Sequence, residues 1–86
     1  MNKEILRREI IELIEEKIGI DEKILIEYSG EHSLFEPLIG MKPRDLLTIF
    51  FEIQGKYRID FVEHDILERR FDFLTNIVDA IVEKVV

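Results

Sequence analysis

The two histidines of the chain, His32 and His64, have acidic neighbours that could join them in binding a metal ion. Glu31 precedes His32 in the sequence. Glu63 and Asp65 flank His64. Imidazole and carboxylate groups are common metal ligands, but neither histidine has a second histidine at the spacing of an H-E-x-x-H helix. We therefore predict no metal site and interpret both histidines as surface residues.

No set of residues typical of an enzyme centre is found in the chain. The absence of cysteine excludes disulfides, thiolate zinc sites and cysteine nucleophiles. The sequence contains neither a Gly-x-Ser-x-Gly turn nor a Walker-type phosphate loop. Carboxylates are abundant, but no spacing singles out a pair for acid–base chemistry. The sequence therefore favours a protein that is not an enzyme.

Leu47 and Phe51 are the residues whose spacing best suits recognition of another protein. They lie four positions apart in a predicted helix and therefore share one face. Four other apolar residues suffice for the core stripe of that helix: Leu46, Ile49, Phe50 and Ile53. Two readings stay open, since the pair either widens the core stripe or forms an exposed anchor for a partner. We predict the exposed anchor.

Two long helices are predicted near the ends of the chain. The first spans about Asn2 to Ile18, with Asn2 as its cap and Gly19 as its end. The last spans about Asp72 to Lys84, with Asp72 as its cap. Their apolar residues recur at helical spacing: Leu6, Ile10, Leu13, Ile14 and Ile18 in the first, and Phe73, Ile77, Ala80 and Ile81 in the last.

A long connection without a sustained period runs from about Gly19 to Lys42. Within it, Ile24–Ile26 is consistent with a short strand or a helical turn. We expect Phe35, Leu38 and Ile39 to hold this connection against the core. Loops of such length are uncommon in small domains and are often functional.

A further helix is predicted from about Pro43 to Gln54, and a short one within 62–69. Proline suits the first position of a helix, and Asp45 suits its positive end. Gly55 is expected to end this helix. The order of long helix, long loop, helix, short helix and helix predicts an all-α fold, a small four-helix bundle, as one domain over residues 1–86.

Net charge and hydropathy indicate which classes of partner the protein can bind and where in the cell it is found. The formal net charge is −7, which repels phosphate backbones, so we expect no nucleic acid among the partners. No apolar run approaches the roughly 18 residues of a membrane span. The first four residues lead into alternating charge rather than a signal-peptide core, so we expect a cytoplasmic protein.

The stretch from Ile39 to Phe61 resembles the central part of acyl carrier proteins. That family has a loop ending in Leu-Gly-x-Asp-Ser-Leu, then a helix, an aromatic residue and a short Ile-x-hydrophobic link. Ile39-Gly40-Met41 matches the start of the pattern, and the residues Tyr57-Arg58-Ile59-Asp60-Phe61 match its end. Phe35 takes the place of a loop aromatic. The resemblance implies an acyl-carrier-like four-helix bundle with a long first loop.

The chain departs from this family at the residues that carry the family's chemistry. Lys42, Pro43 and Arg44 stand where the family has aspartate, serine and leucine. The family serine takes the phosphopantetheine arm from coenzyme A, and proline has no hydroxyl to accept it. The resemblance therefore implies a branch without the arm or any other cofactor, similar to the acyl carrier-related proteins of bacterial peptide maturation systems.

Ser33 provides the alternative interpretation, a genuine acyl or aminoacyl carrier with 4'-phosphopantetheine on this serine. His32-Ser33-Leu34 is one residue away from Asp-Ser-Leu. The family serine begins a continuous helix, however, whereas Pro37, Gly40 and Pro43 would interrupt a helix that starts here. An ordinary loop serine is the favoured reading of Ser33.

These expectations combine into one functional prediction. The chain is expected to be a non-catalytic module that docks on a biosynthetic or peptide-modifying enzyme. Its binding residues would be Lys42, Arg44, Leu47 and Phe51, on the helix that follows the long loop. A structural subunit that associates with itself is a more remote third possibility.

Overall fold

The helix α1 (Lys3–Ile18) begins and ends where the sequence predicts. In the computed structural model, which describes residues 2–62 and 70–85, the side chain of Asn2 accepts hydrogen bonds from the backbone N–H groups of Glu4 and Ile5, at 2.8 and 3.2 Å. Gly19 ends the helix with φ +90°, a left-handed conformation that glycine adopts without strain.

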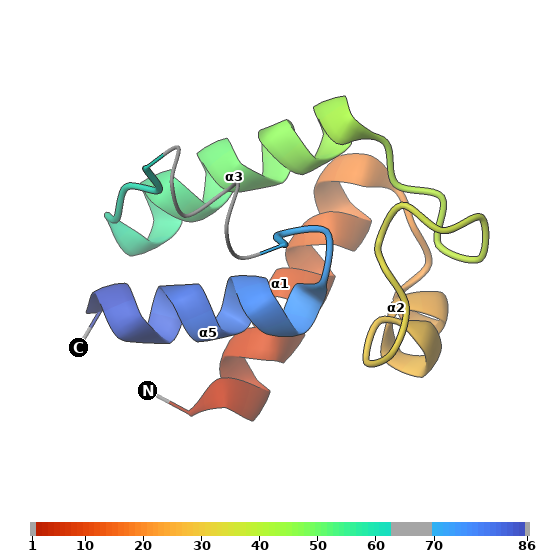
Figure 1. Cartoon of the computed structure of the whole chain (residues 1–86), viewed down its shortest axis with the longest axis horizontal. Coiled ribbons are helices and arrows are strands. Elements are labelled where there is room, and N and C mark those ends of the chain that lie inside the picture. Colours follow the sequence, from red (N-terminus) through yellow and green to blue (C-terminus); the bar gives the residue numbers. More distant parts are fainter. Residues whose placement is uncertain (1, 63–69, 86) are drawn as a thin grey trace.

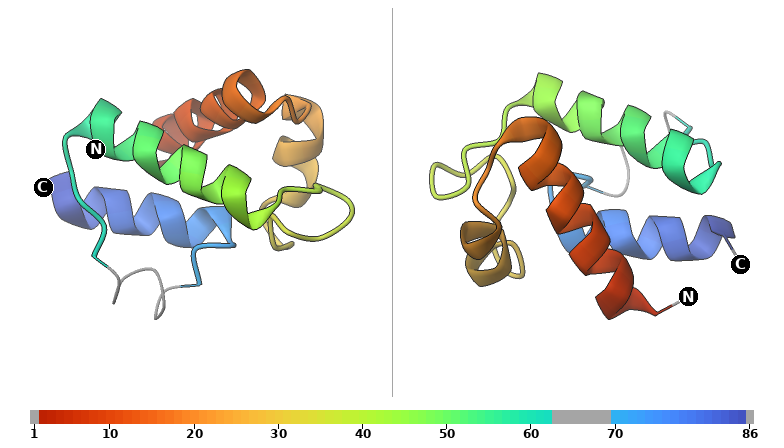
Figure 2. Two further views of the ribbon diagram at one scale, coloured as in Figure 1. Left: turned by 90° about the horizontal axis from the view of Figure 1, so that it is seen from above. Right: turned by 180° about the vertical axis from the view of Figure 1, so that it is seen from behind.

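Within the described residues, three further helices pack against α1: α2 (Glu22–Tyr28), α3 (Pro43–Tyr57) and α5 (Leu74–Val85). In Figure 1, α1 passes obliquely behind α3 and α5, and the right view of Figure 2 shows it in front of them. The described ranges contain no strand, which confirms the all-α prediction. Within those ranges, no helix is long and apolar enough to cross a membrane. The short helix expected within 62–69 falls almost wholly outside the described residues.

The helix α2 corrects the prediction of one long connection after α1. The segment around Ile24–Ile26 is helical, and the carboxylate of Asp21 caps it by accepting from the N–H of Lys23 at 2.8 Å. Only Leu25 of this helix is buried, so its apolar pattern is too short to establish a period. The loop proper therefore covers 29–42.

Of the three residues predicted to hold the loop against the core, only one is buried. Ile39 is buried as expected, but the side chains of Phe35 and Leu38 are 40% and 49% exposed. Leu34 and Met41 are buried in their place, and a 3.0 Å hydrogen bond joins the N–H of Met41 to the carbonyl of Leu34. The loop thus turns back on itself and leaves the ring of Phe35 at the surface.

Asp72 is not the cap that was predicted for the last helix. The helix α5 begins two residues later, at Leu74. The carboxylate of Asp72 instead accepts hydrogen bonds from Ser33 at 2.7 Å and from Arg70 at 3.3 Å. Its carbonyl accepts from the N–H of Leu34 at 2.6 Å. Asp72 therefore fastens the loop to the start of α5.

Gly55 does not end α3, which continues for two residues to Tyr57. Glycine in a helix interior costs only about 1 kcal/mol relative to alanine, which packing of the helix offsets. Arg58 ends the helix with φ +55°, and its N–H donates to the carbonyl of Gln54. The hydroxyl of Tyr57 donates to Glu9 of α1 at 2.7 Å. Partial burial and this bond to a carboxylate raise the pKa of Tyr57 well above its usual value.

The core lies between α1, α3 and α5 and includes an aromatic cluster of Phe50, Phe61 and Phe71. Their rings meet edge to face with centroid distances of 5.6, 5.4 and 5.1 Å. Such pairs contribute about 0.5–1.5 kcal/mol each beyond the area that they bury. Because Phe71 precedes α5 and Phe50 belongs to α3, this cluster joins the two elements that frame the candidate site.

Candidate docking surface on α3

Pro43 occupies the first position of α3, where the resemblance to acyl carrier proteins would place the serine. It has no hydroxyl, so this position cannot carry a phosphopantetheine arm. The helix start is closed by Asp45, whose carboxylate accepts from the N–H of Lys42 at 3.1 Å, while its own N–H donates to the carbonyl of Lys42 at 2.9 Å. Lys42 has extended backbone and gives no side-chain cap.

Leu47 and Phe51 both lie on the outer surface of α3. Their side chains are 53% and 70% exposed, whereas the adjacent Leu46 and Phe50 are 7% and 5% exposed. The predicted exposure of the pair is confirmed, and its role in binding stays a prediction. An isolated exposed leucine needs no explanation, but a leucine and a phenylalanine one turn apart form a continuous apolar patch.

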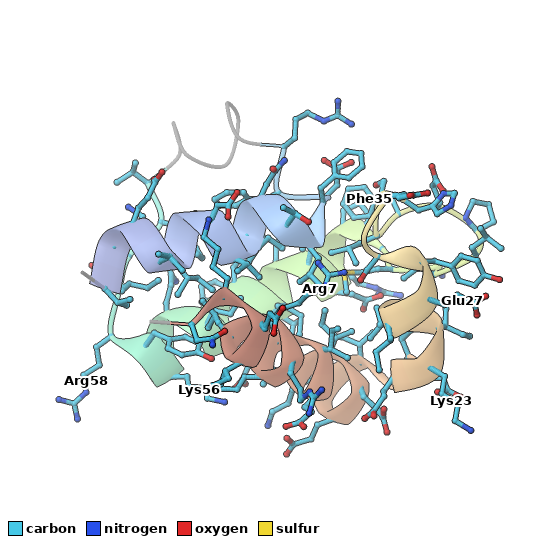
Figure 3. The ribbon with its side chains drawn as sticks, turned by 90° about the horizontal axis from the view of Figure 1, so that it is seen from below. Arg7, Lys23, Glu27, Phe35, Lys56 and Arg58 are labelled. Carbon is cyan, nitrogen blue, oxygen red and sulfur yellow. The ribbon has the colours of Figure 1, made fainter. Side chains whose placement is uncertain are left out.

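Beside Leu47 the surface is hollowed into an open groove of about 420 Å³, which we name the Pro43 groove. Three separate segments build it: the loop before α3, the first half of α3 and the residues just before α5. Figure 3 labels Phe35 on that loop, which passes beside the start of α5. The lining residues are Phe35, Pro43, Leu46, Leu47, Phe50, Arg70, Phe71 and Asp72. The groove is therefore largely apolar, with one ion pair at its edge.

That ion pair joins Arg70 and Asp72. The guanidinium Nε and Nη2 atoms lie 3.3 Å from the two carboxylate oxygens, and the guanidinium also stacks over the ring of Phe73 at 5.0 Å from its centroid. Partial burial alone would raise the pKa of Asp72, but hydrogen bonds from Arg70 and Ser33 outweigh it and lower that pKa below its usual value. Asp72 is consequently ionised at neutral pH.

Lys42 and Arg44 are exposed cations at the start of α3. Neither side chain makes a hydrogen bond or ion pair with any described residue. Arg44 lies three residues before Leu47 and therefore on the same flank of the helix. At about 100° per residue, Asp45 and Glu52 fall on the other flank. The flank that carries the apolar patch thus holds positive charge and no carboxylate from α3.

Ser33 lies in the loop and not at the start of a helix. Its hydroxyl donates to Asp72 at 2.7 Å and accepts from the N–H of Phe35 at 3.2 Å. Both bonds hold the loop in place. The oxygen that the alternative carrier reading requires as an attachment point is thus already part of the contact between the loop and the start of α5.

The histidine positions add no group of metal ligands in the described part of the chain. His32 pairs with Glu36, since Nδ1 and Oε2 lie 2.6 Å apart, and its ring meets the edge of Tyr28. Nowhere in residues 2–62 and 70–85 do three histidine, aspartate or glutamate side chains gather as ligands. His64 lies outside those residues.

A second hollow, of about 510 Å³, lies between α1 and α2 and shares no residue with the Pro43 groove. Its lining is mixed in charge: Glu4, Arg7, Arg8, Ile11, Glu12, Glu22 and Ile26. The guanidinium of Arg7 is held by the hydroxyls of the buried Ser29 at 2.9 Å and of Thr75 at 3.5 Å. Figure 3 shows Lys23 and Glu27 on the outside of α2. Arg8 and Ile26, which line this hollow, therefore serve as control positions for variants of α3.

The structure brings together only part of the predicted site. Pro43 and Leu47 line one groove, with Arg44 and Phe51 on the same flank of α3. Sequence reasoning missed Arg70 and assigned Phe35 to the core. The sequence could not predict that Phe35 is exposed, because the path of its loop depends on hydrogen bonds to Asp72, which is more than thirty residues away.

Comparison of the chain with models of known protein families, with curated proteins and with solved structures finds no match in any of the three.

Proposed function

We propose that the chain is an acyl-carrier-like interaction module without a phosphopantetheine arm, which docks on a biosynthetic or peptide-modifying enzyme through α3. The exposure of Leu47 and Phe51, on the helix that begins with Pro43, carries this proposal. Monomeric proteins rarely leave a contiguous apolar patch in water without a binding use. A binding role therefore accounts for two residues that the core of α3 does not need.

The start of α3 supports the arm-free form of this proposal. Lys42, Pro43 and Arg44 replace all three residues by which a carrier would present its arm and meet the transferase. The hydroxyl of Ser33, the alternative attachment point, is hydrogen-bonded to Asp72 in the described structure. No catalytic role is proposed for any residue of the chain.

Photocrosslinking from α3 tests this proposal in the cells that make the protein. A benzoylphenylalanine side chain would be placed at Phe51 and, as the control, at Ile26, which is 60% exposed on α2. We expect the variant at position 51 to form an adduct with one biosynthetic or peptide-modifying enzyme, identified by mass spectrometry, and the variant at position 26 to form none. An adduct of equal yield from both positions, or none from position 51, would contradict docking through α3.

A further inference from the structure

The charges around the Pro43 groove differ from those of the chain as a whole. The chain carries a net charge of −7, yet Arg70 lines the groove, and the exposed Lys42 and Arg44 flank Pro43, which also lines it. The two carboxylates described beside these cations already have partners: Asp72 is bound to Arg70 and Ser33, and Asp45 accepts from the backbone N–H of Lys42. An acidic protein therefore presents a cationic rim, the residues Lys42, Arg44 and Arg70, along part of its apolar groove.

Stability of the fold does not explain two of these cations, Lys42 and Arg44. Cations at the start of a helix interact unfavourably with its positive end, and neither the Lys42 nor the Arg44 side chain pairs with a described carboxylate. Arg70 keeps its Nη1 group without a hydrogen bond to any described residue. Toward the described residues 2–62 and 70–85, the three cations therefore retain donors that are not used.

The shape of the surface favours a polypeptide over a small molecule. Small-molecule sites bury most of their ligand, whereas this groove is open and the ring of Phe51 stands outside its lining. A helix or an extended segment laid along α3 would fill the groove with one side chain and cover Phe51 with the next. One such occupant would remove both apolar features from water.

We propose that the Pro43 groove receives a large apolar side chain from an acidic amphipathic segment of the partner. Carboxylates that flank this side chain would pair with Arg44 and Arg70. This inference rests on the proposed function, since it assigns the partner's chemistry at the surface assigned there. Complementary charge would speed the encounter and fix the orientation of the segment more than it raises affinity.

Peptide selection tests the inference without knowledge of the partner. Random twelve-residue peptides displayed on phage would be selected on the immobilised protein, and the enriched sequences would be resynthesised with a fluorophore for anisotropy titrations. We expect leucine, isoleucine or phenylalanine flanked by aspartate or glutamate. We also expect Arg44→Glu to weaken binding at least about tenfold at low salt, where surface charges are least screened. Arg8→Glu, the same charge change at the second hollow, should change it less than about twofold.

The outcomes separate this inference from the proposed function. If enriched peptides lose affinity in Leu47→Ala and Phe51→Ala but are neutral or basic, the docking surface stands and the acidic partner is overturned. If no peptide is enriched, or if those variants bind equally well, both proposals are overturned. Sedimentation of the wild-type protein adds a third outcome: a dimer that Phe51→Ala dissociates would make a second copy the occupant and overturn the acidic partner.

Discussion

The hydroxyl of Ser33 donates a 2.7 Å hydrogen bond to Oδ2 of Asp72, thirty-nine residues later in the chain. A second bond, 2.6 Å long, joins the N–H of Leu34 to the carbonyl of Asp72. These two bonds place the loop beside the start of α5, where Phe35 and Arg70 become walls of the Pro43 groove. The candidate site therefore depends on a contact between two segments that are distant in sequence.

The first prediction concerns the ionisation of Asp72. Because its pKa is lowered in the folded protein, the carboxylate stabilises the fold above its unfolded-state pKa of about 4. That stability is lost as the pH falls through the lower folded-state pKa. Asp72→Asn should therefore be less stable than wild type at pH 7, and the difference should shrink below about pH 4. Urea unfolding at several pH values would measure both free energies.

Asp79→Asn is the matched control for that experiment. Asp79 pairs with Lys3 at 2.9 Å on the exposed surface, where such a pair contributes at most about 1 kcal/mol. We expect Asp72→Asn to be the more destabilising of the two at pH 7. Equal free energies of unfolding for the two variants at pH 7 would show that the link between the loop and α5 is not specially stabilising.

The second prediction uses two adjacent phenylalanines as a matched pair. Phe51→Ala should change the free energy of unfolding by no more than about 0.5 kcal/mol, since the ring is mostly in water. Phe50→Ala removes a ring from the aromatic cluster and should cost about 3–5 kcal/mol. Thermal or urea unfolding distinguishes them, and a large loss of stability in Phe51→Ala would place that ring in the core.

The third prediction concerns the phosphopantetheine arm. Incubation of the protein with coenzyme A and a broad-specificity phosphopantetheinyl transferase should leave its mass unchanged. A stoichiometric gain of about 340 Da would refute the arm-free account. Mapping that gain to Ser33 by peptide mass spectrometry would establish the alternative, a genuine carrier. A conventional acyl carrier protein in the same reaction confirms that the transferase is active.

The fourth prediction concerns restoration of the attachment site. Pro43→Ser alone should remain a poor substrate of the transferase, because Lys42 and Arg44 still flank the new hydroxyl. The triple variant Lys42→Asp, Pro43→Ser, Arg44→Leu should be modified faster, as followed by mass against time. Rapid modification of the single variant would mean that the flanking residues matter little to the transferase.

Both ends of α1 and the start of α3 could be predicted from the sequence, because caps and period agree there, whereas the cap predicted for α5, Asp72, binds Ser33 and Arg70 instead. Asn2 and Gly19 bound α1 as expected, and Pro43 begins α3. The helix α2 was missed because a seven-residue helix with one buried side chain gives too few apolar repeats. The prediction that α3 ends at Gly55 was wrong, because tertiary packing overrides the weak helix propensity of one glycine.

The candidate site could be predicted only where it depends on a single helix. The exposure of Leu47 and Phe51 followed from counting the apolar residues that the core face of α3 requires. The groove itself could not be predicted, because Phe35, Arg70 and Asp72 meet there through long-range contacts. The position of these three residues depends on how distant segments pack together, which local residue spacing does not reveal.

The affinity of the protein for the enzyme captured from position 51 tests the central claim most directly. Isothermal titration calorimetry would compare wild type, Phe51→Ala and the control Ile26→Ala, an exposed apolar residue of α2. Docking through α3 predicts that Phe51→Ala weakens binding by about 2 kcal/mol or more, roughly thirtyfold, while Ile26→Ala leaves it unchanged. Equal affinities of Phe51→Ala and wild type would contradict the claim that α3 is the docking surface.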